Sequence, residues 1–126
     1  MSNSIEYGPF DWIAEIDIKA FDAPIDDVDL KMKSCGHKCF LDVCFIQEAE
    51  KSILEDCKLY LRCKHVQNDV LGLKLFKKID NGRPEEYYVE IPQDVCEVGN
   101  VQAFIEIVNE KFVVRTDKFL VNISEK

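Results

Sequence analysis

Apolar and polar residues alternate one by one along most of this chain, and this alternation limits its possible folds more than any other feature. Successive side chains of a β-strand point to opposite faces, so a strand with this pattern has one face in a core and one in water. In residues 10–19 only Ile13 interrupts the polar face. The apolar positions of that segment are Phe10, Trp12, Ala14, Ile16 and Ile18. The pattern predicts half-buried β-strands, and no window of about eleven residues has a helical period.

The same reasoning predicts about eight strands, separated by turns at intervals of about 8–15 residues. Residues 38–47 are apolar on both faces, which is typical of a more central strand. Asn81-Gly82 marks a tight turn before the strand at 86–92. This spacing favours an all-β fold, an antiparallel β-sandwich, over an alternating α/β fold. The predicted strands are 10–19, 27–33, 38–47, 57–66, 70–76, 86–92, 101–108 and 111–123.

The length and apolar content of the chain are those of one globular domain. The sequence has 126 residues, of which 47% are hydrophobic, enough to form a core at this length. We therefore expect a single domain over residues 1–126. Residues 1–9 precede the first predicted strand and have no assigned partner strand, so they are expected to form an N-terminal arm.

The charge balance argues against two classes of partner. Asp and Glu number 24 against 16 Lys and Arg, a formal net charge of −8, which repels a nucleic-acid backbone. No apolar run approaches the roughly 20 residues that span a bilayer. The N-terminus is acidic and lacks the apolar core of a signal peptide. We expect neither a nucleic-acid nor a membrane partner, and neither a signal peptide nor a transmembrane segment.

Six cysteines raise the question of metal or disulfide chemistry. A zinc site needs four ligands, and Cys35, His37 and Cys39 with the distant Cys96 form a weak candidate set. Cys57 and Cys63 lie on one predicted strand with Cα atoms about 20 Å apart, too far for one ion or one disulfide. Disulfides from Cys39 to Cys57 or Cys63 stay possible. Buried thiols in the core are the simpler interpretation of Cys39, Cys57 and Cys63.

A catalytic site is not evident in the sequence. His37 and His65 are the only histidines, and His37 lies two residues from both Cys35 and Cys39 without forming a recognised nucleophile signature. His65, near a predicted strand end, is expected on the solvated surface. The five glycines are scattered singly, so no phosphate-binding loop is present. The sequence predicts a protein that is not an enzyme and has no cofactor.

Aromatic residues supply the candidate contact positions. Tyr7, Phe10 and Trp12 cluster at the entry to the domain, although Trp12 also suits a core position. Tyr87 and Tyr88 follow the Asn-Gly turn. Neighbouring residues of a strand point to opposite faces, so one of these two tyrosines is expected to face outward.

The last third of the chain is similar to a known family. The positions that carry the pattern are Gly99, Val101, Ala103, Ile105 and Ile107, then Thr116, Phe119, Val121 and Ile123. Residues 39–70 contain a strand, a polar turn and a strand, and the likeness spans residues 27–124. In these segments the chain resembles the N-terminal immunoglobulin-like domain of tailed-phage baseplate upper proteins.

The resemblance implies an immunoglobulin-like β-sandwich of about 7–9 strands. It also implies a non-catalytic virion structural or interaction protein, with other virion proteins and copies of itself as partners. Members of that family continue into a long shaft, whereas this chain ends at Lys126. Capsid decoration or a head fibre is therefore considered beside a baseplate or tail role. Two alternatives remain: a small acidic phage-encoded inhibitor of a host protein, and a Cys/His metal-binding domain.

Overall fold

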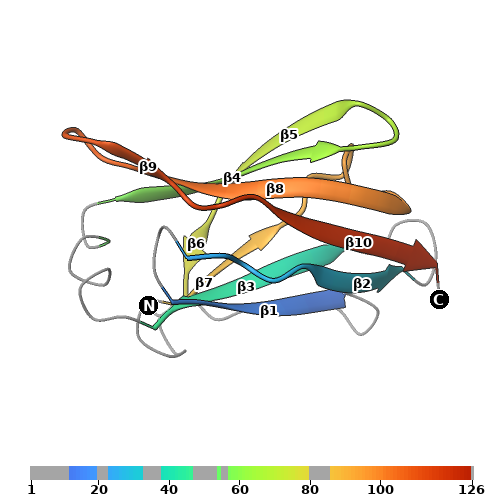
Figure 1. The fold of residues 1–126 in the computed structure, drawn as a ribbon, viewed down its shortest axis with the longest axis horizontal. Coiled ribbons are helices and arrows are strands. Elements are labelled where there is room, and N and C mark those ends of the chain that lie inside the picture. Colours follow the sequence, from blue (N-terminus) through green and yellow to red (C-terminus); the bar gives the residue numbers. More distant parts are fainter. Residues whose placement is uncertain are drawn as a thin grey trace.

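The described residues form two β-sheets stacked face to face (Figure 1). The computed structural model describes residues 12–19, 23–32, 38–46, 54, 57–79 and 86–125. Ten strands lie within these ranges, and they confirm the expected all-β sandwich.

The smaller sheet contains four strands in the order β1-β3-β7-β6, as far as the structure describes the chain. Every residue of β3 is buried, which agrees with the expectation of a central strand. β6 and β7 pair with each other and lie on either side of the predicted Asn-Gly turn, whose residues are outside the described ranges. The strands are β1 (Trp12–Ile18), β3 (Cys39–Phe45), β6 (Lys77–Lys78) and β7 (Glu86–Glu90).

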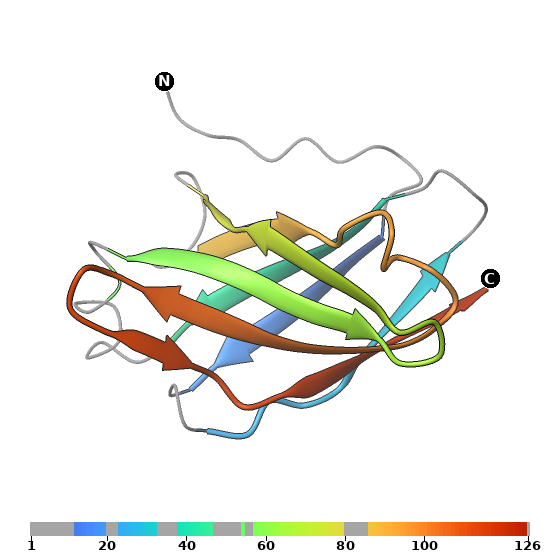
Figure 2. The ribbon, with the colours of Figure 1, turned by 90° about the horizontal axis from the view of Figure 1, so that it is seen from above.

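The larger sheet contains six described strands, five of them in the order β2-β10-β8-β4-β5, with β9 also paired to β8. In the view from above, β5 lies on one side of the sandwich and residues 23–27, which lead into β2, run along the opposite side (Figure 2). The strands are β2 (Val28–Met32), β4 (Lys58–His65), β5 (Val70–Leu75), β8 (Gly99–Val108), β9 (Val113–Arg115) and β10 (Phe119–Glu125).

The expectation of a wholly antiparallel sandwich is wrong for two strand pairs. β1 pairs in parallel with β3, and β2 pairs in parallel with β10. The partners of neither pair are consecutive in sequence, because β2 of the larger sheet separates β1 from β3, and seven of the described strands separate β2 from β10. β1 and β3 are therefore not joined by a hairpin and can run in the same direction. Side chains alternate equally in both pairings, so the sequence pattern does not distinguish them.

The segment predicted as one final strand is two strands. β9 and β10 are separated at Thr116, whose hydroxyl accepts a hydrogen bond from the backbone N–H of Ile105 at 2.9 Å. The backbone N–H of Thr116 donates in turn to the Ile105 carbonyl at 2.9 Å. This division and the short β6 account for ten described strands where about eight were expected.

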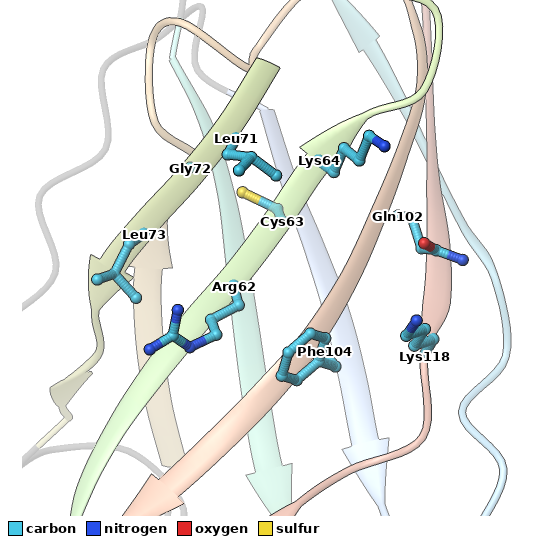
Figure 3. Close-up of a pocket in the computed structure, with 9 residues that line it drawn as sticks. All are labelled: Arg62, Cys63, Lys64, Leu71, Gly72, Leu73, Gln102, Phe104 and Lys118. Atoms are coloured by element: carbon cyan, nitrogen blue, oxygen red, sulfur yellow. The ribbon is translucent and has the colours of Figure 1, made fainter. Parts of the chain in front are cut away.

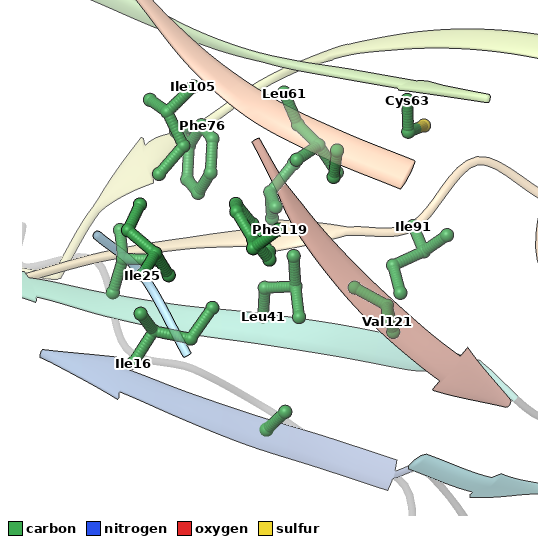
Figure 4. Close-up of a cluster of buried hydrophobic side chains, with 14 of the residues drawn as sticks. Ile16, Ile25, Leu41, Leu61, Cys63, Phe76, Ile91, Ile105, Phe119 and Val121 are labelled. Atoms are coloured by element: carbon green, nitrogen blue, oxygen red, sulfur yellow. The ribbon is translucent and has the colours of Figure 1, made fainter. Parts of the chain in front are cut away.

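The core lies between the two sheets (Figure 4). Ile16 and Leu41 of the smaller sheet face Leu61, Ile105 and Phe119 of the larger one, and all five are buried. Burying a side chain of this kind contributes about 1.5–3 kcal/mol relative to leaving it exposed. These inward residues occupy the apolar positions of the alternating pattern, so the sandwich follows directly from that pattern.

Candidate interaction surface

The outward face of β5 carries three leucines. Leu71, Leu73 and Leu75 are 75%, 52% and 47% exposed, respectively. They occur at every second position of β5, so all three point to the same side of the sheet. The strand is an edge of the larger sheet, since β4 is its only ladder neighbour among the described residues. Large exposed apolar side chains that gather in one place are typical of contact sites.

Beside these leucines the outward face is hollowed (Figure 3). The hollow has a volume of about 410 Å³. Its floor crosses three neighbouring strands. Leu73 of β5 lies opposite Arg62 of β4, and Arg62 lies opposite Phe104 of β8. We call this surface the leucine groove, and its outward-facing lining is Arg62, Lys64, Leu71, Leu73, Gln102, Phe104 and Lys118.

Cations surround the leucine groove although the whole chain has a net charge of −8. Lys64 is half-exposed and pairs with Asp69 in the following turn at 2.8 Å. At the far end of β8, Glu106 lies between two arginines, with 3.1 Å to Arg62 Nε and 2.9 Å to Arg115 Nε. The Arg115 guanidinium, together with that of Arg62, holds the pKa of Glu106 below its ordinary value. Cations outnumber carboxylates on this face, so the groove is apolar with a basic rim.

A second hollow lies beside β1 and the start of β2, with a volume of about 530 Å³. Four carboxylates and one cation line it: Glu15 and Asp17 of β1, Lys19 directly after β1, and Asp26 and Asp27 of the loop that precedes β2. Asp27 also accepts a hydrogen bond from the backbone N–H of Leu120 at 3.0 Å, which ties the loop to β10. We call this surface the acidic edge. Its carboxylates are spread out in the sequence, and only the fold brings them together.

The predicted aromatic contact residues have different surroundings. Tyr87 is buried and packs edge to face on Phe45, with ring centroids 6.1 Å apart and an interplanar angle of 82°. The Lys78 ammonium lies 5.2 Å from the centroid of the Tyr87 ring. Tyr88, on the opposite face of β7, is half-buried.

The remaining predicted contact residues are in the first part of the chain. The backbone of Trp12 begins β1 opposite Cys39. Tyr7 and Phe10 lie outside the described residues. The proposed arm at residues 1–9 lies outside them as well.

Two of the four weak metal-ligand candidates come together. The thiol of Cys96 is hydrogen-bonded to Cys39, and this interaction lowers the pKa of Cys96. Cys35 and His37 lie outside the described residues. Within the described ranges, no three His, Cys, Asp or Glu residues form a group suited to a metal ion.

The cysteines that the structure describes are present as thiols. Cys39 and Cys63 are buried in the core as expected, whereas Cys57 is half-buried. Burial raises the pKa of the Cys63 thiol to about 11. This thiol therefore stays protonated at neutral pH and behaves as a small apolar core residue.

The expectation that His65 is solvated is wrong, because its side chain is only 1% exposed. His65 shares the parity of Leu61 and Cys63 on β4, so it points into the molecule. Its Nδ1 accepts a hydrogen bond from the backbone N–H of Asn68 at 3.2 Å. The proton is therefore on Nε2, which lies 3.1 Å from the carbonyl oxygen of Val98. His65 thus joins the turn after β4 to the loop before β8.

Sequence reasoning missed the leucine groove because both faces of residues 70–76 contain apolar residues. The decisive residue is Gly72, which faces inward. A Cβ added there would lie 2.8 Å from Val95 Cγ2 and 2.9 Å from Cys63 Sγ. The loop after β7 therefore packs on the glycine side of β5, and the leucine side is left facing out. The leucine repeat was visible in the sequence, but its direction depended on this tertiary contact.

Two further findings complete the description, one on membrane-spanning helices and one on known proteins. In the part of the chain that the structure describes, no helix has the length and apolar character needed to cross a membrane. No protein-family model matches the chain, and no curated protein matches it either.

Proposed function

We propose that this chain is a non-catalytic structural or interaction protein of a phage virion, acting through protein-protein contacts. The observation that carries the proposal is the row Leu71, Leu73 and Leu75 on an exposed edge strand. Exposing these side chains is unfavourable in water, and covering them with a partner recovers about 25 cal/mol for each Å² of apolar area removed from water.

The edge position of β5 strengthens this interpretation. Natural edge strands are commonly protected from association by charged residues, proline or bulges. On the outward face of β5 the side chains are leucines, while Lys74 points to the other side. An edge strand with such an apolar face is expected to be covered by a partner when the protein functions.

The virion part of the proposal is supported by the resemblance to the N-terminal domain of baseplate upper proteins, and by the β-sandwich architecture. Its partners are other virion proteins and further copies of the chain. Its place is the baseplate or tail, or the capsid surface as a decoration or head-fibre protein.

Mass spectrometry of virus particles purified on a density gradient tests this function. We expect the chain in the particles at a fixed ratio to the other structural proteins. A triple variant, Leu71→Ser with Leu73→Ser and Leu75→Ser, should fold normally, because exposed substitutions typically change stability by about 0.5 kcal/mol or less. It should nevertheless be lost from the particles.

Lys74→Ser is the matched control, since it alters the same strand on its opposite face and should leave incorporation unchanged. Absence of the wild-type chain from the particles contradicts the proposed function. Normal incorporation of the triple variant contradicts the assignment of β5 as its contact surface.

A small acidic inhibitor of a host protein is a second candidate, favoured by the gathering of Glu15, Asp17, Asp26 and Asp27 at the acidic edge. Such a protein occupies the nucleic-acid site of its target with carboxylates in place of phosphates. It should inhibit a host nucleic-acid enzyme, and Asp26→Asn should weaken that inhibition. Undiminished enzyme activity at excess protein removes this candidate.

A Cys/His metal-binding domain is a third candidate, favoured by the contact between Cys39 and Cys96. Elemental analysis of the purified chain tests it directly. A zinc content well below one ion per chain removes this candidate, and Cys96→Ser should abolish any zinc that is found.

A further inference from the structure

We propose that the leucine groove of one copy of this chain binds the acidic edge of the next copy, in a head-to-tail contact. This inference rests on the proposed function and names the partner of the same surface. The two surfaces are complementary in charge: three cations and no carboxylate line the groove, whereas four carboxylates and one cation, Lys19, line the edge.

The acidic edge also offers apolar area to the leucines. Ile13 is 38% exposed on β1 and shares its face with Glu15 and Asp17, two and four positions further along the strand. Pro24 and the half-buried Val28 line the same hollow as the carboxylates. A contact between the two surfaces can therefore bury apolar side chains at its centre and pair charges around them, as stable interfaces do.

A symmetric dimer through two leucine grooves is disfavoured. It would bring Lys64 and Lys118 of one copy towards the same lysines of the other, and like charges in an interface oppose association. The acidic edge of a second copy provides the opposite charge without this conflict. Charge complementarity therefore favours a contact between the groove and the acidic edge over a symmetric contact between two grooves.

The positions of the two surfaces determine what kind of assembly results. β5 ends the larger sheet on one side, and the loop before β2 lies along the other side (Figure 2). Each copy that uses its groove therefore keeps its acidic edge available, and the reverse also holds. Contacts of this heterologous kind build a ring when the rotation closes and an open filament when it does not.

Sedimentation velocity of two charge-reversal variants tests the inference. The groove variant is Lys64→Glu with Lys118→Glu, and the edge variant is Glu15→Lys with Asp26→Lys. Asp27 is left unchanged because it binds the backbone of Leu120. The altered positions are exposed, and thermal unfolding checks that both variants fold.

The wild-type chain should form larger species as its concentration rises at low salt. These species should dissociate in about 1 M salt, where the Debye length is about 3 Å. Each variant alone should stay monomeric. An equimolar mixture should associate again. The unchanged edge of the groove variant fits the unchanged groove of the edge variant, and the two reversed surfaces are complementary in charge to each other.

Lys111→Glu is the matched control, since it makes the same charge change at the tip of the β8–β9 hairpin. It should associate like the wild type. A wild-type chain that is monomeric at every concentration overturns the inference. So does association that both variants retain, or a mixture of the variants that stays monomeric.

The outcome separates this inference from the proposed function. A monomeric chain whose leucine variant is still lost from virus particles overturns the head-to-tail contact and leaves the virion role in place. A chain that associates as described but is absent from particles overturns the virion role alone.

Discussion

At the scale of single residues, Gly99 is tightly constrained by the His65 contact. Its φ of +133° is one that side-chain-bearing residues rarely adopt. A Cβ added to Gly99 would lie 2.6 Å from Gln67 Oε1 and 2.7 Å from His65 Cε1. Both the backbone conformation and the space at this position therefore require glycine.

We expect Gly99→Ala to lower the free energy of unfolding by at least about 1–3 kcal/mol, the typical cost of such a backbone conformation. Urea denaturation of the purified variant measures this loss. Gln102→Ala, at an exposed position of the same strand, should stay within about 0.5 kcal/mol of the wild type. Equal stability of Gly99→Ala and the wild type would show that the side chains of His65 and Gln67 can move aside without a loss of stability.

The Glu106 carboxylate makes stability depend on pH. Its two arginine partners lower its pKa in the folded state, Arg115 contributing most. A lowered folded-state pKa stabilises the fold above the pKa of the unfolded chain, about 4.3 for glutamate, and this contribution disappears as pH falls through the folded-state value.

We therefore expect Glu106→Gln to be less stable than the wild type at neutral pH. The gap should narrow as pH falls below about 4.3. Because the arginines are partly exposed, each ion pair contributes no more than about 1 kcal/mol. Paired urea titrations across this range measure the gap, and a gap independent of pH would exclude charge as its cause.

At the scale of elements, the strands match the predicted segments closely, except where a side chain interrupts the ladder. The β8–β9 hairpin turns at Asn109, whose Oδ1 accepts hydrogen bonds from the backbone of Lys111 and Phe112 at 2.7 and 3.0 Å. Asn109 and Glu110 lie between the predicted strands 101–108 and 111–123, and asparagine is a turn-forming residue. By contrast, the break after Thr116 is visible in the sequence only as a change of phase, because the inward positions are even-numbered up to Thr116 and odd-numbered from Phe119 onward.

Thr116→Val tests how far the Thr116 hydroxyl stabilises this break. Valine has nearly the same shape but leaves the buried N–H of Ile105 without its 2.9 Å acceptor. An unpaired buried group of this kind costs about 1–3 kcal/mol. Thermal unfolding should show that loss for Thr116→Val and a smaller one for Thr116→Ser, which keeps the hydroxyl. A loss for Thr116→Ser as large as that for Thr116→Val would show that the hydroxyl is not the main contribution of this side chain.

At the scale of the whole molecule, the contact between the sheets holds the fold together. Phe119 is 2% exposed and lies between the sheets near Leu41 (Figure 4). Phe119→Ala should cost about 3–5 kcal/mol through lost burial and the cavity that remains. Leu120→Ala, at a half-buried position one residue along, should cost much less in the same denaturation experiment. A similar cost for both would contradict this arrangement of the core.

The alternating pattern by itself determined the strand positions, the inward faces of most strands and the sandwich class, because burial of every second side chain is a local property of β-strands. Only the tertiary structure decided which strands are neighbours, which pairs are parallel, and that Leu71, Leu73 and Leu75 face outward. The gathering of Glu15 and Asp26 at one edge likewise depended on it. The physical reason is the same in each case: these arrangements come from packing between residues far apart in the chain, such as Val95 against Gly72, and local periodicity carries no information about such contacts.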